Sequence, residues 1–148
     1  MRISSNSRPA TKVAVPALRY FAAVLGIVAG LIHFAVTPEH FEEAFEFGAF
    51  MTVVGIFQVV SSVMLMVRPS RLLVVVIIVF NALVAATYAI AYTVGLPFGP
   101  KPGEPEQVNG PGSAATIGEL VLLVVLLGVL VALLRRGGFR QPPGTNPV

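Results

Sequence analysis

Four long apolar runs dominate the pattern of hydrophobic and polar positions along the chain. They cover about residues 17–36, 47–67, 72–93 and 117–134. Each run is close to the roughly 20 residues that a helix needs to cross a hydrocarbon core of about 30 Å. The third and fourth runs lack the polar stripe at helical period that a soluble bundle would show. The pattern therefore predicts an all-α polytopic membrane protein, a four-helix transmembrane bundle.

Charged residues alternate between the two ends of this predicted bundle. The seven carboxylates are Glu39, Glu42, Glu43, Glu46, Glu104, Glu106 and Glu119. Nine of the ten cations fall in the other segments, and Lys101 is the exception. Because positively charged segments stay in the cytoplasm, we expect a multi-pass protein of the cell membrane with cytoplasmic N- and C-termini. The outer loops are then residues 37–46 and 94–116.

The chain divides into one membrane domain and two polar ends. Residues 1–15 are predicted to form a disordered cytoplasmic lead, and residues 137–148 a disordered cytoplasmic tail. The transmembrane domain then covers residues 16–136. Its second outer loop is rich in proline and glycine, so we expect it to lie over the outer end of the bundle without helix or strand.

Composition excludes several classes of function. The chain has no cysteine, which excludes disulfides, thiolate metal sites and thiol redox chemistry. The sequence pI is about 9.8, but the cations form short clusters beside apolar runs, so no nucleic-acid partner is expected. No phosphate-binding loop, nucleophile elbow or HExxH motif occurs, and a non-enzymatic role is favoured.

The first run carries a close-packing signal on one face. Gly26 and Gly30 form a small-xxx-small pair, which lets two helix backbones approach closely in lipid. His33 lies on the same face, so we expect it to point toward another helix. Thr37-Pro38-Glu39 has the residue types of a helix start. We therefore expect a new helix to run from Pro38 into the second run.

In such a helix the polar and small residues separate into two stripes. The four clustered glutamates would face water. The other stripe, about 145° away, would face the bundle interior. Its members are His40, Ala44, Gly48, Met51, Gly55, Gln58 and Ser62.

Two amides lie near the middle of neighbouring runs. Gln58 in the second run and Asn81 in the third are at similar depth, and we expect them to hydrogen-bond to each other between helices. The alternative is that they line a buried polar cavity. Thr116 and Glu119 have the spacing of a capping box, so Glu119 is expected to cap the fourth helix, with a ligand role as the alternative.

Several chemistry-bearing side chains fall in the outer third of the predicted bundle. The candidate ligand or metal residues are His33, His40, Met51, Tyr88 and Glu119. Imidazoles with a carboxylate suit zinc or iron, and imidazoles with methionine suit copper, so a divalent metal is one hypothesis. A haem held by His33 and His40 and a quinone beside His33 and Tyr88 are others. The competing interpretation is that these are packed or hydrogen-bonded side chains, with Tyr88 and Tyr92 as interfacial anchors.

Short motifs resemble a known type of membrane protein. They are Leu31-Ile-His33, Pro38-Glu39-His40-Phe41, Arg68-Pro69-Ser70-Arg71 and the stretch from Thr93 to Pro100. Together they resemble small four-span membrane proteins of high-GC Gram-positive and related bacteria with no assigned activity. The resemblance implies architecture and no chemistry. A looser similarity to DoxX-type four-helix membrane proteins concerns topology alone.

Three functions remain open from the sequence. The favoured one is an accessory or interaction subunit that packs in the lipid bilayer against another membrane protein or a second copy of itself. The second is extracytoplasmic binding of a metal or cofactor, haem or quinone, within the bundle. The third is an oligomeric transporter or channel.

Overall fold

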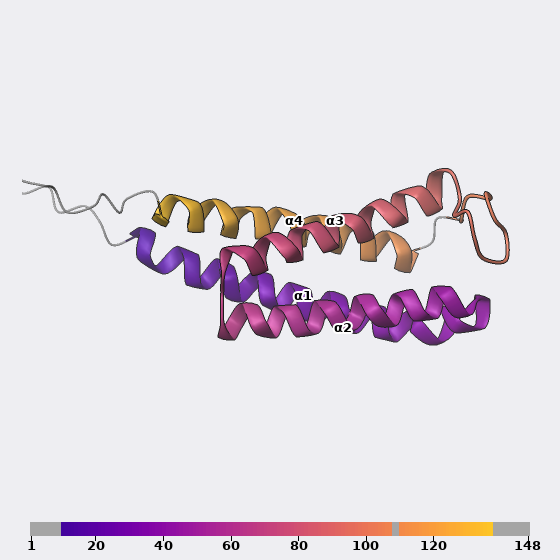
Figure 1. Cartoon of the computed structure of the whole chain (residues 1–148), viewed down its shortest axis with the longest axis horizontal. Helices are drawn as coiled ribbons and strands as arrows, with labels where there is room; N and C mark the ends of the chain where they lie inside the picture. Colours follow the sequence, from indigo (N-terminus) through magenta and orange to yellow (C-terminus); the bar gives the residue numbers. More distant parts are fainter. Residues whose placement is uncertain (1–9, 108–109, 138–148) are drawn as a thin grey trace, which may run out of the picture.

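A computed structural model describes residues 10–107 and 110–137 of the chain. In these residues it has four α-helices and no strand: α1 (Ala10–Glu43), α2 (Phe45–Val67), α3 (Arg71–Thr93) and α4 (Gly110–Gly137). All four are long and apolar enough to cross a membrane, which confirms the predicted number and type of elements. The helices form an elongated bundle, with α1 and α2 in one layer and α3 and α4 in the other (Figure 1).

The two ends of the bundle carry opposite charge. The start of α1, the α2–α3 turn and the end of α4 lie at one end, which we call the arginine end because Arg68, Arg71 and Arg135 are there (Figure 1). The α1–α2 turn and residues 94–107 lie at the other, the glutamate end. At the arginine end, Ser70 caps α3 by accepting a hydrogen bond from the Leu73 N–H at 3.1 Å.

The first helix does not end where the sequence predicted. α1 continues through Pro38 to Glu43, so residues 37–43 of the expected outer loop are helical and Thr37 does not begin a new helix. Thr37 Oγ1 instead donates to the His33 carbonyl at 2.8 Å, which is the bond that threonine makes inside a helix. Ala44, in extended conformation, alone separates α1 from α2. On either side of the proline α1 packs on α2, with the Phe34 ring against Gly55 and the Phe41 ring against Gly48.

The fourth helix begins earlier than predicted. It starts at Gly110, whereas the expected start was residue 117. Pro111 suits the first turn of a helix, and Ala114 and Ala115 have the highest helix propensity, so the segment extends the helix outward. Glu119 is consequently well inside α4 and does not cap its first turn. Ala10–Val15 of the expected disordered lead are helical, and the rest of that lead and residues 138–148 of the tail lie outside the described residues.

The loop before α4 folds back over the glutamate end, as expected. Gly95, Gly99 and Gly103 adopt positive φ, and the Glu106 N–H bonds to the Ala91 carbonyl at 2.9 Å. The Phe98 ring lies 6.1 Å from the ring of Phe47 on α2. These contacts hold residues 94–107 against the ends of α2 and α3.

Apolar side chains cover the outside of the bundle as well as its core. A buried cluster nearer the arginine end joins all four helices and consists of Ala22, Ala23, Leu65, Val74, Ile77, Leu122, Leu126 and Val129. Large apolar side chains on the outer faces are exposed, such as Val53 at 58%, Leu83 at 63% and Val124 at 69%. Such an exterior fits lipid rather than water.

The glycine pair brings α1 and α2 into close contact. A Cβ on Gly30 would lie 2.9 Å from the Gly55 carbonyl oxygen and 2.8 Å from Val59 Cγ2. A Cβ on Gly26 would collide with the Ser62 hydroxyl. Both glycines thus have the packing role that the sequence predicted, and α1–α2 is the most extensive helix pair in the described chain.

Candidate ligand cavity at the glutamate end

A cavity of about 170 Å³ opens between the four helices near the glutamate end. Its wall includes four aromatic side chains, Phe47 and Phe50 from α2 and Tyr88 and Tyr92 from α3. Its polar side chains come from three parts of the chain. These are His33, Glu39, His40 and Glu43 on α1, Thr87 on α3, and Glu106 in the loop.

His33 is held at the cavity wall by two hydrogen bonds. Its side chain is buried, at 2% exposure. Nδ1 lies 2.9 Å from the Ala29 carbonyl, and because a carbonyl only accepts, Nδ1 carries the hydrogen. Nε2 lies 3.3 Å from the Tyr88 hydroxyl, so it accepts that O–H in the neutral imidazole. Both ring nitrogens are therefore occupied by protein groups.

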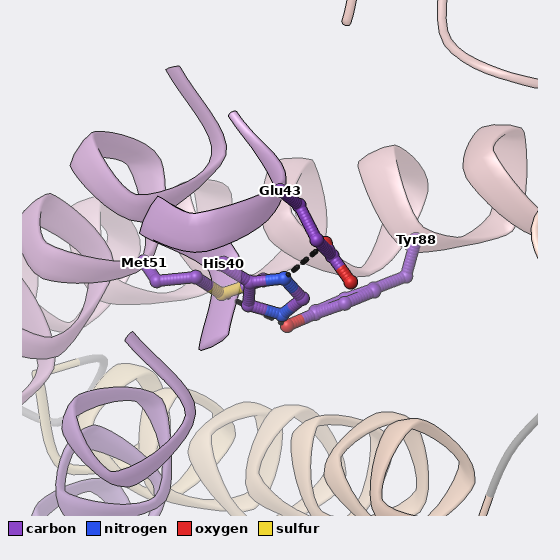
Figure 2. Close-up of polar contacts among 4 residues, drawn as sticks. All are labelled: His40, Glu43, Met51 and Tyr88. Carbon is purple, nitrogen blue, oxygen red and sulfur yellow. Dashed lines mark hydrogen bonds and ion pairs between the residues drawn. The ribbon is translucent and has the colours of Figure 1, made fainter. Parts of the chain in front are cut away.

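His40 and Met51 complete the polar side of the cavity. His40 Nδ1 and Glu43 Oε2 are 2.9 Å apart. The Tyr88 hydroxyl also lies 3.5 Å from the sulfur of Met51. Figure 2 shows the His40 ring, the Tyr88 hydroxyl and the Met51 sulfur turned toward one another, with Glu43 beside them. The Tyr88 hydroxyl has one hydrogen, and it goes to His33 Nε2, which is nearer and a better acceptor than the thioether sulfur of Met51.

Four of the five predicted site residues line this cavity: His33, His40, Met51 and Tyr88. The two histidines come together because both are on α1, seven residues or about two turns apart, and so share a face. That arrangement cannot place two imidazoles on opposite sides of a haem. Glu119 is not part of the lining.

Glu119 belongs to a second buried cluster. The predicted hydrogen bond between the two amides is present, with Gln58 Nε2 donating to Asn81 Oδ1 at 2.9 Å. The same Nε2 also donates to Glu119 Oε1. All three side chains are at most 1% exposed. This cluster joins α2, α3 and α4 inside the bundle.

The four clustered glutamates are exposed, as the sequence predicted, but two of them are not separate from His40. Glu42 and Glu46 do not line the cavity, whereas Glu39 and Glu43 line it together with His40. The prediction placed His40 on the second helix and calculated its direction from that helix. His40 is instead on α1, which continues to Glu43. The His40-x-x-Glu43 spacing could have indicated this contact, because residues three apart on a helix are neighbours. Glu106 had no such signal, since only the folded loop brings it to the wall.

The donor set at the cavity weighs against a metal centre. Within residues 10–107 and 110–137, no group of three or more His, Cys, Asp or Glu side chains could hold a metal ion. His33 already has partners at both nitrogens. The cavity instead offers aromatic rings and separate carboxylates.

Replacing Tyr88 by phenylalanine tests the hydrogen bonds of the site. Tyr88→Phe leaves His33 Nε2 without its donor, and we expect a loss of about 1–2 kcal/mol in stability with the fold unchanged. Detergent unfolding and the nitrogen chemical shifts of the His33 ring would measure it. The control is Tyr20→Phe, an exposed tyrosine near the arginine end. Equal effects of the two variants would contradict the assignment.

Comparison of the chain with family models, with curated proteins and with solved structures found no match. The family resemblance of the short motifs therefore stays a prediction. Fold and cavity define the class of protein: a four-helix chain of candidate membrane spans with a polar and aromatic cavity near one end.

Proposed function

We propose that this is a multi-pass protein of the cell membrane that binds a small organic cation in the cavity at its glutamate end. The observation that carries the proposal is the wall itself, which combines four aromatic rings with three carboxylates, those of Glu39, Glu43 and Glu106. Aromatic faces and carboxylates both attract cations, and aromatic cages are a common way to hold quaternary ammonium groups.

Charge and volume support this choice of ligand. Neither lysine nor arginine is among the described residues of the wall, so its three carboxylates make it acidic. A cavity of about 150 Å³ holds a benzene-sized molecule, so one of about 170 Å³ suits a quaternary ammonium group or a single-ring amine. A haem is far too large. A quinone headgroup would fit by size, but the carboxylates give no preference for a neutral ring.

The orientation of the chain is part of the proposal. The described cations at the arginine end support a cytoplasmic location for that end, because positive segments are retained there. Both termini would then be cytoplasmic, and the cavity would face the outer side of the membrane.

Choline and its neutral isostere 3,3-dimethylbutanol are the matched probes. In purified protein reconstituted in nanodiscs, we expect calorimetry to show choline binding at least about tenfold tighter, since desolvated cation–π contacts contribute about 2 kcal/mol. Equal binding of the alcohol, or tighter binding of a benzoquinone, would contradict the cation proposal, and the second result would favour the quinone alternative.

Carboxylate variants locate the site. Glu39→Gln should weaken choline binding about three- to tenfold, because it removes one negative charge from the wall. Glu42→Gln is the matched control, since Glu42 is exposed on the same helix but does not line the cavity. An equal loss in both variants would mean that the cation is attracted only by the general charge of the glutamate end.

An interaction subunit is the second candidate function. Ala82, Ala86 and Ala89 form an exposed stripe of small residues on α3, and such stripes favour close helix packing in membranes. A second copy of the chain is the partner that can be tested directly. Because the chain has no cysteine, Ala86→Cys should form a disulfide dimer on oxidation in membranes, and Leu120→Cys on α4 should not. Monomers in both cases would contradict self-association through this face.

A further inference from the structure

Glu119 is a buried carboxyl group inside a candidate membrane span, and the cavity does not use it. It is 1% exposed, whereas the other six glutamates of the chain are all exposed. Its Oε1 accepts a hydrogen bond from Gln58 Nε2. An ionised carboxylate at such a depth is strongly disfavoured unless it is fully paired.

The orientation of the Gln58 amide follows from its neighbours. Asn81 Nδ2 donates to the Ile77 carbonyl at 2.8 Å, and a carbonyl only accepts, so Asn81 Oδ1 must face Gln58. Gln58 therefore presents Nε2 to Asn81 Oδ1 and to Glu119 Oε1. Both hydrogens of Nε2 are used, and Gln58 Oε1 is left as an acceptor.

Two atoms of this cluster lack a hydrogen-bond partner among the described residues. They are Gln58 Oε1 and Glu119 Oε2, the remaining oxygens of two side chains that are already joined. The Gln58 oxygen needs a hydrogen-bond donor, and the Glu119 oxygen needs either a donor or a hydrogen of its own. A single hydrogen on Glu119 Oε2 meets both needs, because the carboxyl O–H can donate to the Gln58 carbonyl oxygen.

We propose that Glu119 binds a proton within the membrane span and shares it with Gln58. The neutral carboxyl donates from Oε2 to Gln58 Oε1 and accepts at Oε1 from Gln58 Nε2, so α2 and α4 are joined by two mutual hydrogen bonds. The step is the addition of one proton from water to the carboxylate, which changes its charge from −1 to 0. The structure thereby gains a proton-binding site that is separate from the ligand cavity.

A proton fits this site better than a metal cation does. The space beside Gln58, Ser61, Ser62 and Asn81 is too small for a water molecule, so it would not hold a hydrated cation next to the pair. Two titratable groups on other helices interact with the pair, His33 on α1 with Gln58 and Tyr88 on α3 with Glu119. His33 is engaged by Ala29 and Tyr88 as a neutral ring, so it does not supply a positive charge to Glu119.

Infrared spectroscopy of the full-length protein in lipid at neutral pH tests the proposal. The wild type should show the carbonyl stretch of a protonated carboxylic acid, and Glu119→Gln should lose it. Glutamine is the matched replacement, because its amide can donate to Gln58 Oε1 and accept from Nε2. The control Glu104→Gln, in the exposed loop, should lose intensity from the ionised carboxylate band instead.

The opposite pattern would overturn the proposal. If Glu119→Gln loses carboxylate intensity and leaves no protonated-acid difference, Glu119 is ionised in the folded protein. A measurement on the wild type alone covers the case in which the variant fails to fold. With glutamate labelled by ¹³C at the side-chain carboxyl, a protonated-acid band must shift, and Glu119 is the one buried glutamate to which it can belong. Absence of such a band equally overturns the proposal.

Discussion

Replacing Gln58 by leucine is expected to destabilise the bundle by about 2–3 kcal/mol. The change removes the donor of both Asn81 Oδ1 and Glu119 Oε1, and leaves these buried acceptors without it. An orphaned buried acceptor costs about 1–3 kcal/mol, and hydrogen bonds between membrane helices contribute about 0.6–1.7 kcal/mol. Denaturation by SDS in mixed micelles would measure the loss. Unfolding can be followed by energy transfer between dyes on two cysteines introduced at Arg68 and Arg135. The labelling is specific because the chain has no cysteine of its own.

The comparison variants separate the network from a general effect of substitution. Ser61→Ala, which removes only a 3.3 Å bond to the Gln58 carbonyl within the same helix, should cost less than about 1 kcal/mol. Gln58→Leu combined with Glu119→Leu should cost less than the sum of the single changes, because the second change removes one of the orphaned groups. Strict additivity, or a Gln58→Leu cost as small as that of Ser61→Ala, would show that the cluster does not hold the helices together.

Gly30→Leu is expected to cost about 3 kcal/mol or more, or to prevent the α1–α2 pair from forming. The first carbon of any side chain at this position would lie 2.9 Å from the Gly55 carbonyl oxygen, which is backbone and cannot rotate away. The larger leucine would have to push the helices apart, and overpacking a close contact typically costs 1–3 kcal/mol before such a separation. The same unfolding assay measures this effect.

The control for this prediction is a helical glycine that makes no close contact with another helix. Gly118 on α4 is exposed, and a Cβ built on it meets nothing within 4 Å. Gly118→Leu should therefore be neutral or slightly stabilising, since leucine is the better helix former. If both substitutions are tolerated, the α1–α2 contact is not the tight interface that the structure describes.

Much of the helix arrangement could be predicted because it depends on local properties of the chain. The length of an apolar run decides whether a helix can cross the membrane, and the period of 3.6 residues decides which side chains share a face. For this reason Gly26, Gly30 and the Gln58–Asn81 pair were placed correctly. His33 and His40 share a face of α1 for the same reason, and both line the cavity.

Errors arose where a short signal competed with packing. Thr37-Pro38 has the composition of a helix start, but α1 continues to Glu43 and packs on α2 through Phe34 and Phe41, before and after the proline. The capping-box spacing at Thr116 was misleading because α4 begins at Gly110. As a result, Glu39 and Glu43 line the cavity while remaining exposed, and Glu119 lies in the interior instead of at a helix end.

The sequence by itself determined the number of candidate membrane spans, the opposite charge of the two ends and the inward faces of the helices. These follow from the hydrophobic effect and the helical period, which act along each segment separately. Apart from the Gln58–Asn81 pair, only the tertiary structure decided which groups from different helices meet. The partnership of Glu119 with Gln58, and the gathering of Glu39, Glu43 and Glu106 around four aromatic rings, depend on the rotation and depth of helices distant in sequence. Those quantities are set by side-chain packing between segments, and no pattern within one segment contains them.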